Sequence, residues 1–403
     1  MKRQAQLSRL FDGLGLVLGI GAVLALLYYW DPTRVAIKRL APEADARFEA
    51  IPADMTALPV SEWLSVRDAD EVRQRRARLA ARIFKMPDLP RDLMPQRVMR
   101  DVEKNPGPHH ACLSPTGPAV VRLLSRTDTI IMRALACEAA YYRDWRNLAG
   151  IDELTGYLSK NWRPYSIAYF RPKTANGHLI LYQQGLAATY HDQHRMIEAW
   201  VEDGYTVAAM NMPGYGDNTC YDWRRYCSGP LMDARFATDG GAAFLPPVIA
   251  VNYALAQQPF KRIAMIGVSS GAWITLVSAA IDPRIDVSFP VAGVLPLALL
   301  RGKEESAREI VEGLVDIAGV LDLAVMGADR PGRRQVQIFN RFDRCCFYGP
   351  RPTLYAGLLA ETARNLGGRH QVLFDETHAR HKISGWAVKR ILEAINGDGK
   401  VQP

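Results

Sequence analysis

Cysteine is scarce in this chain, and the motifs that usually mark zinc sites are absent. Six cysteines among 403 residues are too few for a disulfide-built scaffold. The sequence contains neither an H-E-x-x-H motif nor paired C-x-x-C motifs. No nucleic-acid-binding motif accompanies the formal net charge of +8, so we expect solvated arginines and no nucleic-acid partner.

The composition is that of an ordinary globular protein. Hydrophobic residues make up 48% of the chain and charged residues 23%, which excludes a largely disordered protein. At 403 residues, the chain is long enough for one large catalytic domain with additional segments.

The chain begins with a short basic tail, 1–12, and an uncharged apolar run, 13–30. A run of about 18 apolar residues is just long enough to span a bilayer, and the terminal Tyr28, Tyr29 and Trp30 suit its interface. No small-residue cleavage site follows the run, which disfavours a cleaved signal peptide; a buried helix is the third alternative. We therefore expect an anchor in a bacterial inner membrane, with the large domain outside the cytoplasm.

Residues 31–161 have helical character without a catalytic motif. Residues 69–84 are rich in Ala, Arg and Glu, prolines follow them, and 120–142 is predicted to form a longer helix. We predict a helical N-terminal extension that packs on the catalytic domain and has no chemistry of its own.

From residue 162 to residue 403, short apolar runs alternate with helical segments. Strands are predicted at 166–170, 178–182, 205–212, 263–268, 285–294, 335–340 and 371–374. Helices are predicted at 192–202, 239–256, 272–280, 354–366 and 385–395, with a helical insertion at 295–332 that we expect to form a lid. Repeated strand–helix units predict an α/β fold, whose mostly parallel sheet has helices on both faces.

A G-x-S-x-G motif occupies residues 267–271, between a predicted strand and a predicted helix. This strand–turn–helix context is that of a nucleophile elbow, in which a sharp turn exposes the serine. The glycines let strand and helix approach each other and permit a strained backbone. We predict Ser269 as the nucleophile.

A serine hydroxyl needs a histidine as general base and an acid that orients the histidine. Asp343 follows the predicted strand 335–340, and His378 and His381 both follow the next predicted strand. We predict Asp343 as the acid. The base stays open, because His378 is closer to the preceding strand and His381 is closer to the last helix.

An oxyanion intermediate needs backbone N–H donors. Ser270, directly after the nucleophile, is expected to supply one donor. Gly185 or Leu186, in the loop after the strand 178–182, is expected to supply the other.

These features together resemble the α/β-hydrolase superfamily, over residues from about 162 to 403. The resemblance rests on the G-x-S-x-G motif, Gln184-Gly185 after a strand, the M-P-G-Y-G run at 212–216, Asp343 and the histidine loop. It implies a serine hydrolase that cleaves an ester or related acyl bond of a small molecule through an acyl-enzyme, with no cofactor and no metal. Two features depart from the family pattern: Gln183-Gln184 replaces the His-Gly common before the oxyanion loop, and the N-terminal extension lies outside the common core.

Two alternatives belong to other classes of protein. Histidines from the pairs His191/His194 and His378/His381, together with Asp375 or the cysteine thiols, could bind zinc in a metal-dependent hydrolase, which chelation would inactivate. A hydrolase fold without activity could instead serve as a membrane-anchored binding protein, whose Ser269 would not react with a fluorophosphonate.

The cysteines leave the disulfide pairing open, and the oligomeric state is open as well. Cys220 and Cys227 flank a short loop and could form a disulfide in an oxidising compartment. Cys345 and Cys346 follow the predicted acid directly, and we expect a buried pair of small side chains there, because a vicinal disulfide is rare.

Overall fold

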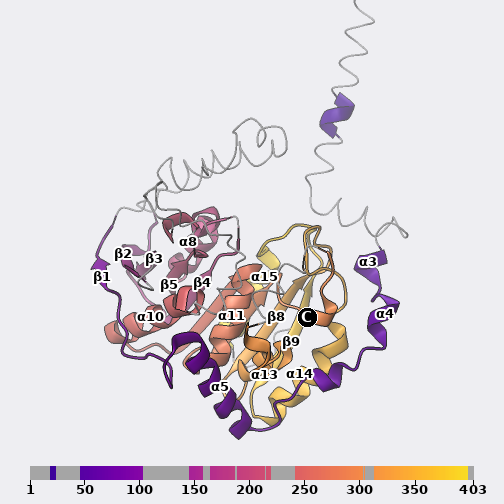
Figure 1. Cartoon of the computed structure of the whole chain (residues 1–403). Helices are drawn as coiled ribbons and strands as arrows, with labels where there is room; N and C mark the ends of the chain where they lie inside the picture. Colours follow the sequence, from indigo (N-terminus) through magenta and orange to yellow (C-terminus); the bar gives the residue numbers. More distant parts are fainter. Residues whose placement is uncertain are drawn as a thin grey trace, which may run out of the picture.

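The computed structural model of the chain describes residues 19–23, 46–102, 145–157, 164–186, 188–213, 215–218, 241–302, 304 and 313–397. Most of these residues form one wide β-sheet with helices packed on both faces, as Figure 1 shows. The sheet positions the predicted site residues, since each of them lies in a loop or at a helix start that follows a strand.

The described strands pair in the order β1-β2-β3-β5-β4-β6-β7-β8-β9. Strands β4 to β9 pair in parallel, whereas β1, β2 and β3 run antiparallel to their neighbours. The strands have the following bounds: β1 Arg97–Met99, β2 Leu148–Tyr157, β3 Pro164–Pro172, β4 His178–Gln183, β5 Thr206–Met210, β6 Arg262–Val268, β7 Val287–Val291, β8 Arg334–Asn340 and β9 Arg369–Asp375.

The helices that the argument uses have the following bounds: α3 Ala46–Glu49, α4 Ala53–Thr56, α5 Ala69–Phe84, α8 His194–Glu202, α10 Gly241–Gln257, α11 Ser270–Ile281, α13 Val320–Met326, α14 Thr353–Asn365 and α15 Gly385–Asn396. Helices α5, α10, α11, α13 and α14 share one hydrophobic core with the sheet, and α8 and α15 share a second core with it.

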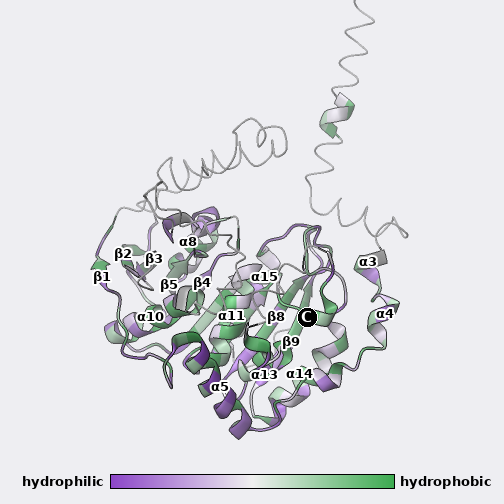
Figure 2. Ribbon diagram, viewed as in Figure 1, coloured by the Kyte–Doolittle hydropathy of each residue, from purple (hydrophilic) through white to green (hydrophobic). Residues whose placement is uncertain are grey.

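Side chains of the central strands alternate between these two cores. In β4, Leu179 and Leu181 belong to the first core, whereas Ile180 and Tyr182 belong to the second. Both faces of a central parallel strand are therefore apolar, as such strands require. In Figure 2 the hydrophobic colouring concentrates in the centre of the molecule, whereas the outer helix α5 is largely hydrophilic.

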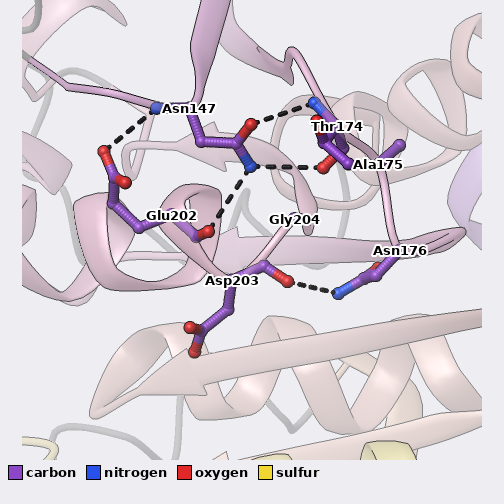
Figure 3. Close-up of a pocket in the computed structure, with 7 residues that line it drawn as sticks. All are labelled: Asn147, Thr174, Ala175, Asn176, Glu202, Asp203 and Gly204. Atoms are coloured by element: carbon purple, nitrogen blue, oxygen red, sulfur yellow. Dashed lines mark hydrogen bonds between the residues drawn. The ribbon is translucent and has the colours of Figure 1, made fainter.

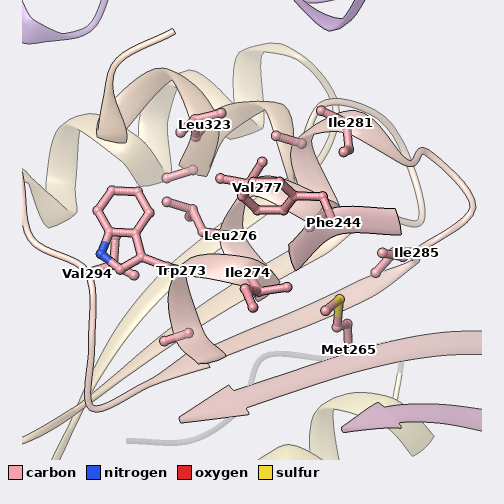
Figure 4. Packing of buried hydrophobic residues seen from close by; sticks show 14 of the residues in the cluster. Phe244, Met265, Trp273, Ile274, Leu276, Val277, Ile281, Ile285, Val294 and Leu323 are labelled. Carbon is pink, nitrogen blue, oxygen red and sulfur yellow. The ribbon is translucent and has the colours of Figure 1, made fainter. Parts of the chain in front are cut away.

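The first core is densest around α11, the helix that follows the G-x-S-x-G motif. Trp273, Leu276 and Val277 of this helix lie near Phe244 of α10 and Leu323 of α13 (Figure 4). The helix is buried from its second residue to its last, so its position relative to β6 is fixed by packing on every side.

Helix α5 confirms the prediction of a helix over 69–84. The carboxylate of Asp68 caps its N-terminus by accepting the N–H groups of Asp70 and Glu71 at 2.8 and 2.9 Å. Lys85 ends the helix in a left-handed conformation.

The segment 31–161, expected to be helical, also contributes strands β1 and β2 to the sheet. These strands were missed because β2 contains Asp152, Glu153 and glycines in place of a strict apolar alternation. The helix predicted at 120–142 lies outside the described residues, and the domain boundaries stay predictions.

Helix α13 lies within the insertion 295–332 that the sequence predicts to be a lid. All of its residues are buried, and it packs against α11 and α14. This part of the insertion is thus a layer of the core. Residue 303 and residues 305–312 lie outside the described residues, and a lid role for the insertion stays a prediction.

The localisation expected from the sequence requires correction. Among the described residues, no helix combines the length and the apolar character needed to cross a membrane. This finding contradicts the expected membrane anchor and the extracytoplasmic position of the domain. Of the span predicted at 13–30, only residues 19–23 are described, and they form a short, exposed helix.

A buried carboxylate holds the N-terminal segment on the core. Asp322 of α13 accepts hydrogen bonds from the backbone N–H groups of Ser65 and Val66 at 2.7 and 2.8 Å and from Ser65 Oγ at 2.8 Å. Because a buried donor without a partner is costly, this carboxylate fixes the path of the chain between α4 and α5.

Replacing Asp322 by Ala should lower the free energy of unfolding by about 3 kcal/mol, because five donors, which include the N–H of Gly319 and the guanidinium of Arg75, lose their acceptor. Urea denaturation measures the change. Asp316→Ala removes an exposed aspartate nearby and should change stability by less than about 0.5 kcal/mol. Equal stability of the two variants would contradict the anchoring role of Asp322.

Candidate active site

Ser269 stands between the end of β6 and the start of α11, with φ 58° and ψ −124°. A left-handed φ is unusual for a residue other than glycine, and such strain clusters at functional sites. The turn is held by a hydrogen bond from the Ser269 N–H to Val291 O at 3.0 Å. The backbone thus has the conformation of the predicted elbow.

The glycines of the motif are required by close packing. A Cβ at Gly267 would overlap the carbonyl oxygen of Gly271, and a Cβ at Gly271 would overlap the carbonyl oxygen of Gln183. Helix α11 can therefore begin directly above the ends of β4 and β6 only because both positions lack a side chain.

The predicted oxyanion loop lies against the serine. A Cβ at Gly185 would lie 2.9 Å from Ser269 Cβ and 2.7 Å from Val268 O. Among the described residues, no hydrogen bond is recorded from the N–H groups of Ser270, Gly185 or Leu186. Gly185 is therefore close to the serine, and the role of these N–H groups as oxyanion donors stays a prediction.

Asp343 follows β8 and is completely buried. Its Oδ2 accepts a hydrogen bond from Nδ1 of His381 at 2.6 Å, and its Oδ1 accepts the N–H of Cys345 at 2.8 Å. The structure thus pairs the predicted acid with His381 and not with His378.

The other ring nitrogen of His381, Nε2, is buried and has no hydrogen-bond partner among the described residues. Ser269 Oγ likewise makes no recorded hydrogen bond within the described part of the chain. Because Nδ1 donates to Asp343, Nε2 of the neutral ring carries a free lone pair. This is the arrangement that a general base needs.

His378 is bound into a different cluster. Its Nε2 contacts Oδ2 of Asp375 at 3.1 Å, and its Nδ1 accepts the N–H of Arg380 at 3.1 Å. Both ring nitrogens therefore have partners, and the side chain is buried. These bonds shape the loop that carries His381.

Asp375, at the end of β9, is the centre of this second cluster. It also accepts hydrogen bonds from Thr377 Oγ1 at 2.6 Å and from Ser384 Oγ, which caps α15. Burial alone would raise the pKa of Asp375, but the hydrogen bonds from His378, Ser384 and Thr377 outweigh burial and lower the pKa to about 2.

Asn340 joins the acid loop to the histidine loop. Its Nδ2 donates to Lys382 O at 2.9 Å and to Arg380 O at 3.2 Å, on either side of His381. As the last residue of β8, it fixes the histidine loop relative to Asp343. Sequence reasoning missed Asn340, although its place at the carboxyl end of a parallel strand was an available signal.

The N-terminal segment packs against both of these loops. Phe48 in α3 is fully buried among Phe342, Tyr348 and Ala379, and its carbonyl oxygen accepts a hydrogen bond from Arg341 at 2.7 Å. No sequence signal pointed to Phe48, because one aromatic residue in a polar segment does not indicate what it packs against.

The two cysteines that follow Asp343 differ from the expectation. Cys345 and Cys346 form a disulfide, and Cys345 is exposed, whereas we expected a buried pair. Among the described residues, the only group of potential metal ligands consists of these two cysteines and His381. His191, His194, His378 and Asp375, which belong to the zinc site considered as an alternative, are not part of this group. Cys112, Cys137, Cys220 and Cys227 lie outside the described residues.

A separate open pocket lies at the opposite edge of the sheet, before the starts of β4 and β5. Figure 3 shows its polar lining, in which Oδ1 of Asn147 accepts the N–H of Thr174 at 2.9 Å and Nδ2 of Asn176 donates to Asp203 O at 3.0 Å. These hydrogen bonds hold loops together, and none of the predicted site residues lines the pocket.

No protein-family model and no curated protein matches the chain. Among solved structures, Methylesterase BT1017 is 15% identical, with a TM-score of 0.55, and the match covers 87% of this chain and 68% of that one. An acetyl xylan esterase from Paenibacillus sp. R4 is 13% identical, with a TM-score of 0.49, and the match covers 86% of this chain and 99% of that one.

The likeness to the methylesterase, together with the mostly parallel sheet flanked by helices, confirms the predicted α/β-hydrolase fold. At 15% identity the likeness bears on the fold and leaves the activity to be argued from the site.

The lowered pKa of Asp375 predicts a pH-dependent contribution to stability. The folded pKa of about 2 lies below the ordinary value of 3.8, so the ionised carboxylate stabilises the fold above about pH 4, and this stabilisation is lost as the pH falls toward 2. Asp375→Asn should therefore lower the free energy of unfolding by about 2 kcal/mol at pH 7 and by about half as much at pH 3.

Urea denaturation at both pH values measures this difference. Asp92→Asn, at an exposed aspartate, is the control and should show no pH-dependent difference from the unmodified protein. A deficit of Asp375→Asn that is as large at pH 3 as at pH 7 would contradict the electrostatic origin of the effect.

Proposed function

We propose that this protein is a serine hydrolase that cleaves an ester or a related acyl bond of a small molecule through an acyl-enzyme. The observation that carries the proposal is the backbone of Ser269, held at positive φ between β6 and α11 with the loop of Gly185 against it. A partly buried serine on such a turn, next to free N–H groups, is suited to nucleophilic attack.

The Asp343–His381 pair supports the same proposal. Parallel strands present their carboxyl ends at one edge of the sheet, and β6, β8 and β9 are parallel members of the same sheet. The serine after β6, the acid after β8 and the histidine after β9 therefore belong to the same edge.

In the proposed reaction, Oγ of Ser269 attacks the carbonyl carbon of the substrate while Nε2 of His381 accepts the hydroxyl proton. Asp343 holds Nδ1 and stabilises the imidazolium that forms. The N–H groups of Ser270 and of Gly185 or Leu186 stabilise the negative oxygen of the tetrahedral intermediate. His381 then gives its proton to the leaving group, and a water molecule, activated in the same way, releases the acyl group.

We assign the base to His381 because its hydrogen bonds fit the role. General base catalysis requires a free lone pair on one ring nitrogen and an oriented ring. His381 has both, whereas both nitrogens of His378 are engaged by Asp375 and by the N–H of Arg380. His378 is a positioning residue in this proposal.

The substrate class follows from the site and, more loosely, from the neighbour of like fold. The solved structure with the TM-score of 0.55 is named a methylesterase, and esters with small groups are therefore the first substrates to test. No step of the proposed reaction calls for a cofactor.

Ser269→Ala should abolish covalent labelling by a fluorophosphonate and lower the rate of p-nitrophenyl acetate hydrolysis about 10³-fold or more. Mass spectrometry of the labelled peptide checks the site of attachment. Ser270→Ala is the matched control, because it keeps the backbone N–H and should retain activity within about tenfold. An intact protein that stays unlabelled at Ser269 would instead favour a binding protein on a hydrolase fold.

Replacing His381 or His378 by Gln should have different effects on kcat and on the free energy of unfolding. His381→Gln should lower kcat about 10³-fold with little loss of stability, because it removes the base. His378→Gln should keep kcat within about tenfold and lower the free energy of unfolding by about 2 kcal/mol, because it leaves buried groups without partners. The reverse pattern, measured by steady-state kinetics and urea denaturation, would identify His378 as the base.

A further inference from the structure

The disulfide between Cys345 and Cys346 lies beside the proposed general base. The sulfur atoms of both cysteines and one ring nitrogen of His381 lie within 4.8 Å of one another. Cys345 is exposed and Cys346 is partly buried, so the disulfide is open to solvent. An exposed disulfide is accessible to thiol or phosphine reductants.

We propose that reduction of this disulfide creates a binding site for one thiophilic divalent metal ion such as Zn²⁺, with Cys345, Cys346 and His381 as its ligands. Two thiolates and an imidazole with a water molecule form a known zinc ligand set. Thiolates also select Zn²⁺ over Mg²⁺ and Ca²⁺, which prefer oxygen ligands.

The separation of the donor atoms suits a tetrahedral ion. Zinc–sulfur bonds of about 2.3 Å and zinc–nitrogen bonds of about 2.0 Å place ligand atoms roughly 3.3 to 3.8 Å apart. The two sulfurs and one ring nitrogen of His381 already lie within 4.8 Å of one another, and cleavage of the S–S bond allows the two sulfurs to separate to the distance that an ion needs.

The surroundings of His381 also resemble those of a metal ligand. Zinc-bound histidines commonly donate their second ring N–H to a carboxylate, which fixes the tautomer and raises the basicity of the ligand nitrogen. Asp343 occupies this position, with its Oδ2 2.6 Å from Nδ1. Nε2, which has no hydrogen-bond partner among the described residues, is the nitrogen left for the ion.

The proposed metal site forms in two steps, reduction of the disulfide and coordination of the ion. A phosphine reductant gives two electrons to the S–S bond and takes its oxygen from one water molecule, whose two protons end on the two sulfurs. Coordination of Zn²⁺ then releases both thiol protons to solvent, and the ion holds two thiolates and one neutral imidazole.

Metal binding and catalysis exclude each other at this histidine, a consequence that rests on the proposed function. The ion occupies the lone pair of Nε2 that would accept the proton of Ser269. The reduced protein with bound Zn²⁺ is therefore inactive, whereas the disulfide form does not respond to the metal.

The binding test uses the full chain, stripped of metal, in the disulfide form and after reduction with a phosphine. Titration with Zn²⁺ against a chromogenic chelator should show one additional ion per chain in the reduced form. Cys345→Ser/Cys346→Ser keeps the four other cysteines and should lose this ion, with affinity at least about 100-fold weaker. His381→Gln should weaken the binding, and Co²⁺ should give a thiolate charge-transfer absorption only when Cys345 and Cys346 are present.

The same Zn²⁺ stoichiometry and affinity in the reduced protein and in the double serine variant would overturn the proposal. Hydrolysis of p-nitrophenyl acetate separates this result from a failure of the proposed function. A protein that is active but binds no additional ion refutes only the metal site, and one that binds the ion but shows no hydrolysis under any condition refutes only the hydrolase. If the protein both hydrolyses the ester and binds the additional ion, Zn²⁺ should inhibit the reduced protein, and a chelator should reverse the inhibition. The activity of Cys345→Ser/Cys346→Ser should not respond to Zn²⁺.

Discussion

The backbone of Ser269 is the constraint on which the rest of the site depends. A φ of 58° costs roughly 1 to 3 kcal/mol for a residue with a side chain, and it persists only where the surroundings impose it. Here the buried strand β6 and the buried helix α11 impose it from both sides. The lack of side chains at Gly267 and Gly271 lets the two elements meet at this turn. The large core around α11 thus supplies the energy that holds the proposed nucleophile in place.

The remaining groups are positioned by hydrogen bonds between loops. Asn340 bonds the main chain on both sides of His381, and the cluster of Asp375, His378 and Ser384 shapes the same loop from the other end. Phe48 packs on the acid and histidine loops from the N-terminal segment. That segment, fixed farther along by Asp322, is therefore part of the frame that orients the proposed dyad, although it lies outside the region that resembles the family.

The sequence was sufficient to predict the elements whose formation depends on residues close to one another in the chain. The strand–turn–helix around residue 269 follows from a short apolar run and the placement of glycines, and the helix over 69–84 follows from its Ala-, Arg- and Glu-rich composition. The choice between His378 and His381 could not be made, because it depends on which carboxylate, Asp343 or Asp375, each ring reaches. Strands β1 and β2 were missed for a related reason: an edge strand is stabilised by its partner, and the sequence does not show the partner.

In the two proposals, the hydrogen bond to Asp343 prepares His381 both to accept a proton and to bind a metal ion. By holding Nδ1, it leaves the lone pair of Nε2 free, and a basic, oriented lone pair serves a proton and a soft metal ion equally well. A hydrolase with such a histidine beside two cysteines needs a reason why the ring is not occupied by metal. The disulfide supplies one, because two bonded sulfurs no longer offer the thiolates that would bring zinc to the ring. The redox state of Cys345 and Cys346 would then decide which of the two reactions the same lone pair performs.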